Sequence, residues 1–223
     1  MSEELAGALG RLDEITRRLR LECPWDREQD ERSIVPHTVE EAYELADAAQ
    51  SGDDAKLLDE LGDVLFQVYF LALLLEERGA GDLAQVAEHC RQKLIRRHPH
   101  VFGDVEAATS GEVLHNWDRI KAETEGGGQF GDLPRTLPAT LYAKKARRRA
   151  AGGQGEDAPG AGVEESATAL QNAGGRDERF EAAGELLFAA VADAVRAGAD
   201  PELALRAAAD RYIAGKQEGQ SPK

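Results

Sequence analysis

The chain contains few of the residues that stabilise small secreted proteins or β-sheets. Only two of its 223 residues are cysteines, Cys23 and Cys90. They are too few and too far apart to indicate a disulfide framework or a zinc site, and we expect reduced thiols in a cytoplasmic protein. Aromatic residues make up 5% of the chain, and no run of alternating β-branched residues occurs. Because Ala, Leu, Glu and Arg are abundant, the sequence predicts an all-α protein.

Two further absences limit the surfaces that the protein can bind. No segment reaches the roughly 18 consecutive apolar residues of a membrane span, and the acidic amino-terminal stretch lacks the pattern of an export signal. The 27 basic residues are outnumbered by 42 acidic ones, which gives a formal net charge of −15. Nucleic acids and anionic membranes require a positive field, so we expect neither as a partner. A phosphate ligand would need metal ions or a local basic cluster.

The chain does contain two acidic pairs with the same spacing on two successive predicted helices. A spacing of three places both side chains of a pair on one helix face. The connection at residues 50–52 is short, so the helices should form an antiparallel hairpin across which the acidic faces meet. Four hard oxygen ligands suit Mg²⁺, with Mn²⁺ as a substitute. The pattern predicts a metal site at Glu41, Glu44, Glu60 and Asp63.

Local signals predict where the helices around this site begin and end. A first helix is expected over residues 3–20, and a loop over residues 23–33. The first acidic helix should begin near Pro36, with Thr38 as a possible cap, and should continue to the breaker at residues 51–52.

The second acidic helix opens at residues 53–54 and ends near residues 78–79. It carries an apolar stripe at helical spacing, formed by Leu57, Leu61, Val64, Val68, Leu71 and Leu75. Solvated acidic faces are the alternative interpretation, and that interpretation would suffice for a single pair. Two pairs beside one stripe favour the metal site.

A basic cluster follows the acidic hairpin. The next predicted helix covers residues 83–97 and is stopped by Pro99. Lys93, Arg96 and Arg97 lie in its last turns. Such cations complement the helix dipole, and guanidinium groups also bind phosphate. In a chain this acidic, the position of the cluster favours phosphate binding.

Several side chains after the basic cluster are further candidates. Lys121, on a helix expected over residues 111–125, is an additional candidate phosphate contact. Trp117 on the same helix could belong to the core or contact a base. His98 and His100 could be ligands, but exposed histidines in turns are common, so they stay unassigned.

Five segments occur in a fixed order: CPWDREQ, VEEAYEL, DELGDVLFQVYF, KLIRRHPHVFGD and VLHNWDRIKAE. In this order and spacing they resemble the MazG family of nucleoside triphosphate pyrophosphohydrolases. The resemblance covers residues 21–123, and residues 137–149 are similar to the family's segment between domains. The family's acidic signature, Glu-Glu-x-x-Glu followed by Glu-x-x-Asp, is complete as Glu40, Glu41, Glu44, Glu60 and Asp63.

The resemblance implies an all-α NTP pyrophosphatase fold, usually a dimer whose helices pack as a four-helix bundle. It implies Mg²⁺ held by the acidic residues and hydrolysis of an NTP or dNTP to a monophosphate and pyrophosphate. The expected role is housecleaning or control of the nucleotide pool. The residues that would contact the phosphates and stabilise the leaving pyrophosphate are Lys93, Arg96, Arg97 and Lys121.

Three interpretations of Glu40 stay open, because it points about 100° away from Glu41 around the helix. It could serve a second ion, orient a metal-bound water as general base, or be solvated. Two other functions are alternatives for the whole site. A diiron bundle expects Glu-x-x-His pairs, and neither Glu41 nor Glu60 is followed by such a histidine. A non-enzymatic nucleotide sensor or assembly module would require lost activity, against which the complete acidic set argues.

The chain is predicted to have four parts. They are a catalytic module at residues 1–125, a connector with a short basic helix and a flexible linker at 126–161, a second MazG-like module at 162–216, and a tail at 217–223.

The second module has lost part of the acidic signature. Glu185 keeps the position of Asp63, but Ala182 stands where Glu60 does. Thr168 stands where Glu44 does, and an Ala-Gly pair replaces the two arginines. We therefore expect this copy to be inactive and retained for packing or pairing.

Overall fold

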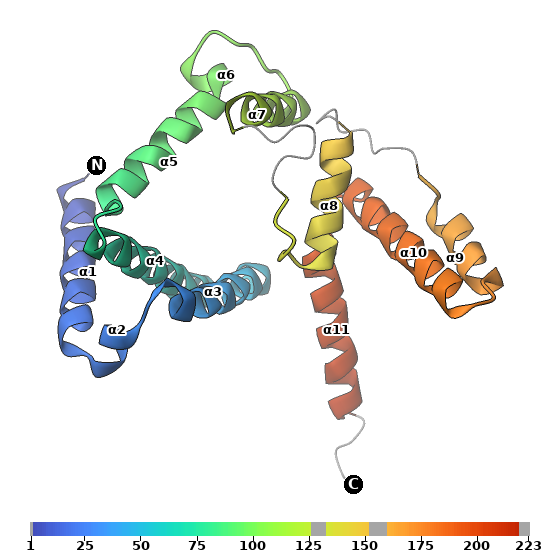
Figure 1. Ribbon diagram of the computed structural model, residues 1–223, viewed down its shortest axis with the longest axis horizontal. Coiled ribbons are helices and arrows are strands. Elements are labelled where there is room, and N and C mark those ends of the chain that lie inside the picture. The colour runs from blue at the N-terminus through green and yellow to red at the C-terminus, as the bar shows by residue number, and fades with distance from the viewer. Residues whose placement is uncertain (1, 126–132, 152–159, 219–223) are drawn as a thin grey trace. The chain divides into compact units, whose positions relative to one another are not determined.

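The computed structural model describes residues 2–125, 133–151 and 160–218 (Figure 1). These residues form eleven helices and no strand, which confirms the predicted all-α class. The chain divides into two compact units, Met1–Lys93 and Leu94–Lys223, and one helix runs across the division. In the described residues no helix combines the length and the apolar character needed to cross a membrane. Cys23 and Cys90 are free, as predicted.

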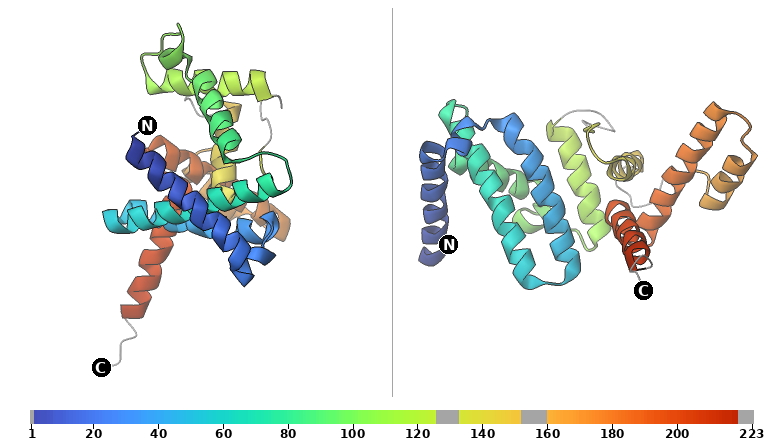
Figure 2. Two further views of the ribbon diagram at one scale, coloured as in Figure 1. Left: turned by 90° about the vertical axis from the view of Figure 1, so that its left-hand side faces the viewer. Right: turned by 90° about the horizontal axis from the view of Figure 1, so that it is seen from below.

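The first unit is built on a helical hairpin. Its helices are α1 (Glu3–Glu22), α2 (Pro24–Glu28), α3 (Glu31–Ser51), α4 (Asp54–Glu77) and most of α5 (Leu83–Arg97). α3 and α4 run side by side in opposite directions (Figure 2). Gly52 makes the reversal possible, because its φ of 72° lies in the left-handed region that favours glycine. The predicted antiparallel hairpin is confirmed.

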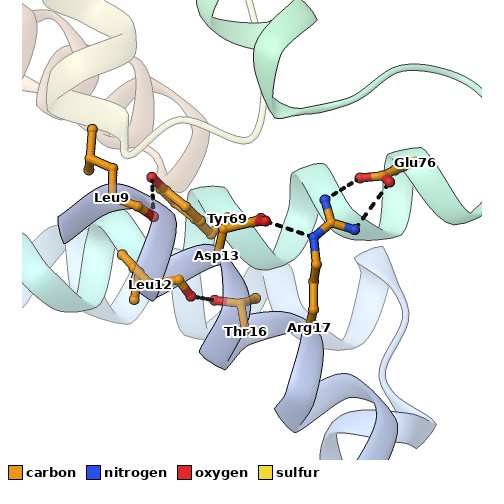
Figure 3. Close-up of polar contacts among 7 residues, drawn as sticks. All are labelled: Leu9, Leu12, Asp13, Thr16, Arg17, Tyr69 and Glu76. Atoms are coloured by element: carbon orange, nitrogen blue, oxygen red, sulfur yellow. Dashed lines mark hydrogen bonds and ion pairs between the residues drawn. The ribbon is translucent and has the colours of Figure 1, made fainter. Parts of the chain in front are cut away.

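α1 is held against α4 by polar contacts (Figure 3). The Arg17 guanidinium donates to both carboxylate oxygens of Glu76, at 3.1 and 2.6 Å. One turn along, Arg20 makes the same two-pronged contact with Glu77, at 2.8 Å for each bond. The Tyr69 hydroxyl also lies 3.4 Å from the Leu9 carbonyl oxygen. Paired bonds of this kind fix orientation as well as distance, so they fix how α1 packs on α4.

The start of the hairpin differs from the prediction. α3 begins at Glu31 because Asp30 caps it: the Asp30 carboxylate accepts from the Ser33 N–H, and the Ser33 hydroxyl lies 2.9 Å from the Asp30 N–H. The expected start near Pro36 with Thr38 as the cap is wrong, since both residues lie inside α3. The loop expected over residues 23–33 is also partly wrong, because it contains α2. The predicted start of α4 at residues 53–54 is confirmed, and Asp53 is its cap.

The core of this unit is formed by Ile34 from α3 with Phe70 and Leu74 from α4, and Phe66 and Leu71 pack against it. The buried face of α4 is therefore rotated from the predicted stripe. Leu61 and Val68, two members of that stripe, are exposed. The period of the pattern is helical as predicted, but a single helix does not indicate which part of a broad apolar surface its neighbour covers.

The second unit contains the end of α5 and six further helices. They are α6 (Pro99–Phe102), α7 (Ser110–Glu125), α8 (Ala139–Ala150), α9 (Val163–Asn172), α10 (Arg176–Arg196) and α11 (Pro201–Glu218). α9 and α10 form a hairpin, and α8 packs against α10 and α11. The Arg147 guanidinium lies 4.7 Å from the centre of the Phe188 ring, and Lys144 bonds Asp200 at 2.6 Å. The four-part division of the chain stays a prediction.

Candidate active site

Three predicted ligands converge on the α3–α4 hairpin. Glu41 comes from α3, and Glu60 and Asp63 come from successive turns of α4. One carboxylate oxygen of each lies within 4.8 Å of those of the other two. In the described residues this is the one group of three potential ligands at such short range. Carboxylate oxygens are the donors that Mg²⁺ and Mn²⁺ take, so the three residues form a possible metal-binding cluster.

The other two acidic residues of the signature lie beside this group. Glu44 follows Glu41 by one turn and is exposed, and its charge acts on both Glu41 and Glu60. Glu40 is also exposed, and its carboxylate lies 3.8 Å from His37 Nδ1. Its effect on Glu41 is the smallest among the neighbouring carboxylates. The structure therefore brings together three of the four predicted metal ligands, and Glu44 and Glu40 lie outside this group of three.

The cluster is electrostatically unfavourable without a cation. Burial raises the pKa of Glu41, and the charges of Asp63 and Glu44 raise it further. Burial also raises the pKa of Glu60, which is only 9% exposed, and Glu44 adds to this, while Lys56 lowers it. A raised pKa in the folded state means that ionisation of these groups opposes folding. A bound cation would remove much of this repulsion.

A hydrogen bond across the hairpin lies next to the cluster. The Thr38 hydroxyl of α3 donates to Gln67 Oε1 of α4 at 3.3 Å, and Gln67 is 6% exposed. Thr38 precedes Glu41 by one turn, and Gln67 follows Asp63 by one turn. This pair therefore fixes the relative position of the two ligand-bearing segments. The sequence contained one signal for it, a glutamine beside the apolar stripe of α4.

The basic residues are divided between the two units. Lys93 is the last residue of the first unit, and Arg96, Arg97 and Lys121 belong to the second. Arg96 is exposed, whereas Arg97 is 8% exposed and its guanidinium lies 5.0 Å from the centre of the Trp117 ring. The ring of His98 contacts the same indole at 4.9 Å. Trp117 is thus a half-buried platform that holds Arg97, and Lys121 follows it by one turn of α7.

Comparison with known proteins identifies the family. The model of the MazG nucleotide pyrophosphohydrolase domain matches residues 29–102. The nucleoside triphosphate pyrophosphohydrolase of Escherichia coli (strain K12) is 38% identical over 203 residues, which cover 85% of this chain and 77% of that protein. This chain belongs to the MazG family. The MazG enzyme of Thermotoga maritima, named a nucleoside triphosphate pyrophosphohydrolase/pyrophosphatase, is 37% identical over 86% of this chain and 76% of its own length. An uncharacterized 26.1 kDa protein of Streptomyces cacaoi is 38% identical over 89% and 77%.

The MazG assignment confirms the predicted family and, with it, a hydrolase that acts on acid anhydrides. The matched segment, residues 29–102, contains the whole acidic signature. It also contains the three cations of α5 that are predicted to bind phosphate, while Lys121 lies beyond it. The MazG domain therefore includes both kinds of residue that the chemistry of a triphosphate requires.

Proposed function

We propose that this MazG protein hydrolyses nucleoside triphosphates to a monophosphate and pyrophosphate in the presence of Mg²⁺. The observation that supports this most directly is the convergence of three carboxylates on the α3–α4 hairpin of a chain related to named pyrophosphohydrolases. Its role would be housecleaning or control of the nucleotide pool. We keep as predictions a cytoplasmic location and the absence of nucleic-acid and membrane partners.

Glu41, Glu60 and Asp63 would hold the metal, with Glu44 as a fourth ligand. Their donor set fits, because all are hard oxygen ligands and the repulsion among them is relieved by positive charge. A divalent cation bound there would neutralise phosphoryl oxygens and lower the pKa of a coordinated water. Glu40, which lies outside the group of three carboxylates, would accept a proton from the attacking water as general base.

The basic residues would bind the phosphates and stabilise the charge that develops on the leaving pyrophosphate. Arg96 is exposed, so its guanidinium is accessible to a ligand. Arg97 is restrained by Trp117, and a restrained guanidinium loses less entropy when it binds. Lys93 and Lys121 complete the proposed set.

We propose a homodimer as the assembled form. An exposed apolar line runs along α4 at helical spacing, formed by Leu58, Leu61, Leu65 and Val68. Leu58 is 74% exposed and Leu61 is 49% exposed, although both flank the buried Glu60. A second copy that covers this line would remove the apolar surface from water. Sedimentation of the purified chain tests this directly, and a monomer at micromolar concentration would contradict it.

The decisive experiment is a product assay with the purified full chain. We expect incubation with Mg²⁺ and each NTP or dNTP to release monophosphate and pyrophosphate, separated by ion-exchange chromatography from diphosphate and phosphate. A chelator should abolish turnover. Failure to release monophosphate from any nucleotide would sink the proposal, and metal-dependent nucleotide binding without turnover would indicate a sensor instead.

A further inference from the structure

A second concentration of positive charge lies where α7 meets α8, within the second unit. The two helices are joined by an ion pair between Arg148 Nη2 and Asp118 Oδ1 at 2.6 Å. On α8, Lys145 and Arg149 lie three residues before and one residue after Arg148. On α7, Lys121 follows Asp118 by one turn. Helical spacing therefore brings the cations of both helices to the side where the ion pair joins them.

The charges at this junction are unbalanced. Burial lowers the pKa of Lys145, and the positive charges of Lys121, Arg148 and Arg149 lower it further. Asp118 opposes them but is already bonded to Arg148. We define these four cations, Lys121, Lys145, Arg148 and Arg149, as the α7–α8 basic cluster. In a chain with a net charge of −15, such a local excess of positive charge favours an anionic ligand.

One donor of this cluster has no partner in the described structure. Arg149 Nη1 is buried from solvent and forms no hydrogen bond. A buried guanidinium nitrogen without an acceptor is unfavourable, so it indicates an acceptor supplied from elsewhere. Asp118 Oδ2 is also buried without a donor. A rearrangement that pairs Arg149 with Asp118 is therefore the competing explanation, and it predicts no anion binding.

We propose that Lys121, Lys145 and Arg149 form a metal-independent binding site for a diphosphate group. The ligand is pyrophosphate, either free or as the terminal phosphates of a nucleoside triphosphate. The choice of this anion rests on the proposed function, in which pyrophosphate is the product and Lys121 already contacts phosphate. A diphosphate offers several acceptor oxygens and more than one negative charge, which suits separate cations on two helices better than a single carboxylate does.

The proposal is tested by calorimetry on the full chain with a chelator present and at fixed ionic strength. The acidic hairpin then holds no cation and repels phosphate, so any binding reports on basic residues, and the variants described next distinguish the α7–α8 basic cluster from the cations of α5. The titrants are inorganic pyrophosphate, a non-hydrolysable triphosphate analogue and a nucleoside monophosphate. We expect pyrophosphate to bind and the monophosphate to bind at least about tenfold more weakly. Comparable binding of the analogue would show that the site takes the substrate's phosphates as well.

A matched pair of variants distinguishes pyrophosphate binding at a specific site from attraction by the overall positive charge of α8. Lys145→Gln and Lys144→Gln remove the same charge from neighbouring positions of α8, but Lys144 is paired with Asp200. We expect Lys145→Gln to weaken pyrophosphate binding about tenfold and Lys144→Gln to change it less than about twofold. Arg149→Gln should weaken binding at least as much as Lys145→Gln. Because Lys145 is more exposed than Arg149, its variant keeps the test usable if Arg149→Gln does not fold.

Three results would overturn this site. They are the absence of pyrophosphate binding by the folded wild-type chain, an equal loss in Lys144→Gln and Lys145→Gln, or tighter binding of a single-stranded oligonucleotide than of pyrophosphate. The product assay with Mg²⁺ is independent of all three. If the chain hydrolyses nucleoside triphosphates but does not bind pyrophosphate without metal, the proposed site is wrong and the proposed function stands. If it binds pyrophosphate but does not hydrolyse nucleoside triphosphates, the site stands and the proposed function is wrong.

Discussion

The α3–α4 and α9–α10 hairpins are both pairs of packed helices, but they differ in how their acidic residues are arranged. In α3–α4, Glu41, Glu60 and Asp63 converge within 4.8 Å. In α9–α10, Ala182 stands at the position that the predicted alignment of the two modules gives to Glu60, and the exposed Glu185 belongs to no such group among the described residues. Helix pairing therefore needs only the apolar surface that both hairpins keep. The carboxylate cluster is an addition that opposes folding, and its presence in one hairpin only points to function.

The largest expected effect is the loss of turnover when one carboxylate of the α3–α4 cluster is removed. Glu60→Gln keeps the shape of the side chain but removes the ligand charge, so we expect turnover of a nucleoside triphosphate to fall about 100-fold or more. Helix content by circular dichroism should stay unchanged. Glu185→Gln is the matched control in the other hairpin and should leave turnover within about twofold. A large loss in the control would show that the second hairpin is not inert.

Arg96→Ala tests one of the two arginines that the predicted second module lacks. Because Arg96 is exposed, its loss should act on substrate binding rather than on the fold. We expect KM to rise about tenfold with a smaller change in kcat, in line with one charge-assisted hydrogen bond. Arg91→Ala, on the same helix and paired with Glu88, is the control. If Arg96→Ala and Arg91→Ala raise KM equally, the effect comes from the lost positive charge and not from a specific contact of Arg96 with the substrate.

Thr38→Val tests whether the bond across the α3–α4 hairpin positions the ligands. The substitution leaves the buried Gln67 Oε1 without its donor, which costs on the order of 1–3 kcal/mol of stability. We expect turnover to fall several-fold and the Mg²⁺ concentration for half-maximal activity to rise. Thr38→Ser retains the hydroxyl and should restore both values. If Thr38→Ser does not restore both values, the hydrogen bond does not position the ligands.

The smallest expected effect is on how the thermal stability of the chain depends on pH. Because the pKa values of Glu41 and Glu60 are raised in the folded state, the wild-type chain should lose stability as pH rises above about 4.5 through those values. In Glu60→Gln this loss should be smaller, so with a chelator its Tm should exceed that of the wild type at neutral pH and approach it in acid. Scanning calorimetry from pH 4 to 8 measures the difference. Parallel pH profiles would contradict the electrostatic cost.

The sequence predicted those parts of the fold that depend on local signals. Asp53 and Pro99 mark helix ends by chemistry that acts over one turn, and the structure places α4 and α5 accordingly. The start of α3 was missed because Pro36 also suits a first turn, while the competing signal, Asp30 with Ser33, lies earlier. A local pattern cannot decide between two such starts when tertiary packing of Ile34 favours the longer helix.

Non-local features were less accessible from sequence. The spacing of the acidic pairs predicted that they share a hairpin, yet it did not predict that Glu60 is almost buried while Asp63 is exposed. That difference depends on which face of α4 its neighbours cover. The bond between Thr38 and Gln67 and the stacking of Arg97 on Trp117 join residues about 20 or more positions apart, and neither pair follows a helical period.

The Thr38–Gln67 bond also limits how far the chain can tolerate insertions. One additional residue in α3 between Thr38 and Glu41 would turn the carboxylate about 100° around the helix and shift it about 1.5 Å along the axis. The bond would still form, but Glu41 would no longer point at Glu60 and Asp63. The same insertion after Ser51, in the turn at Gly52, would leave this geometry intact. The number of residues between Thr38 and Glu41 is therefore fixed by the geometry of the site. An inserted residue is tolerated at the turn that follows Ser51.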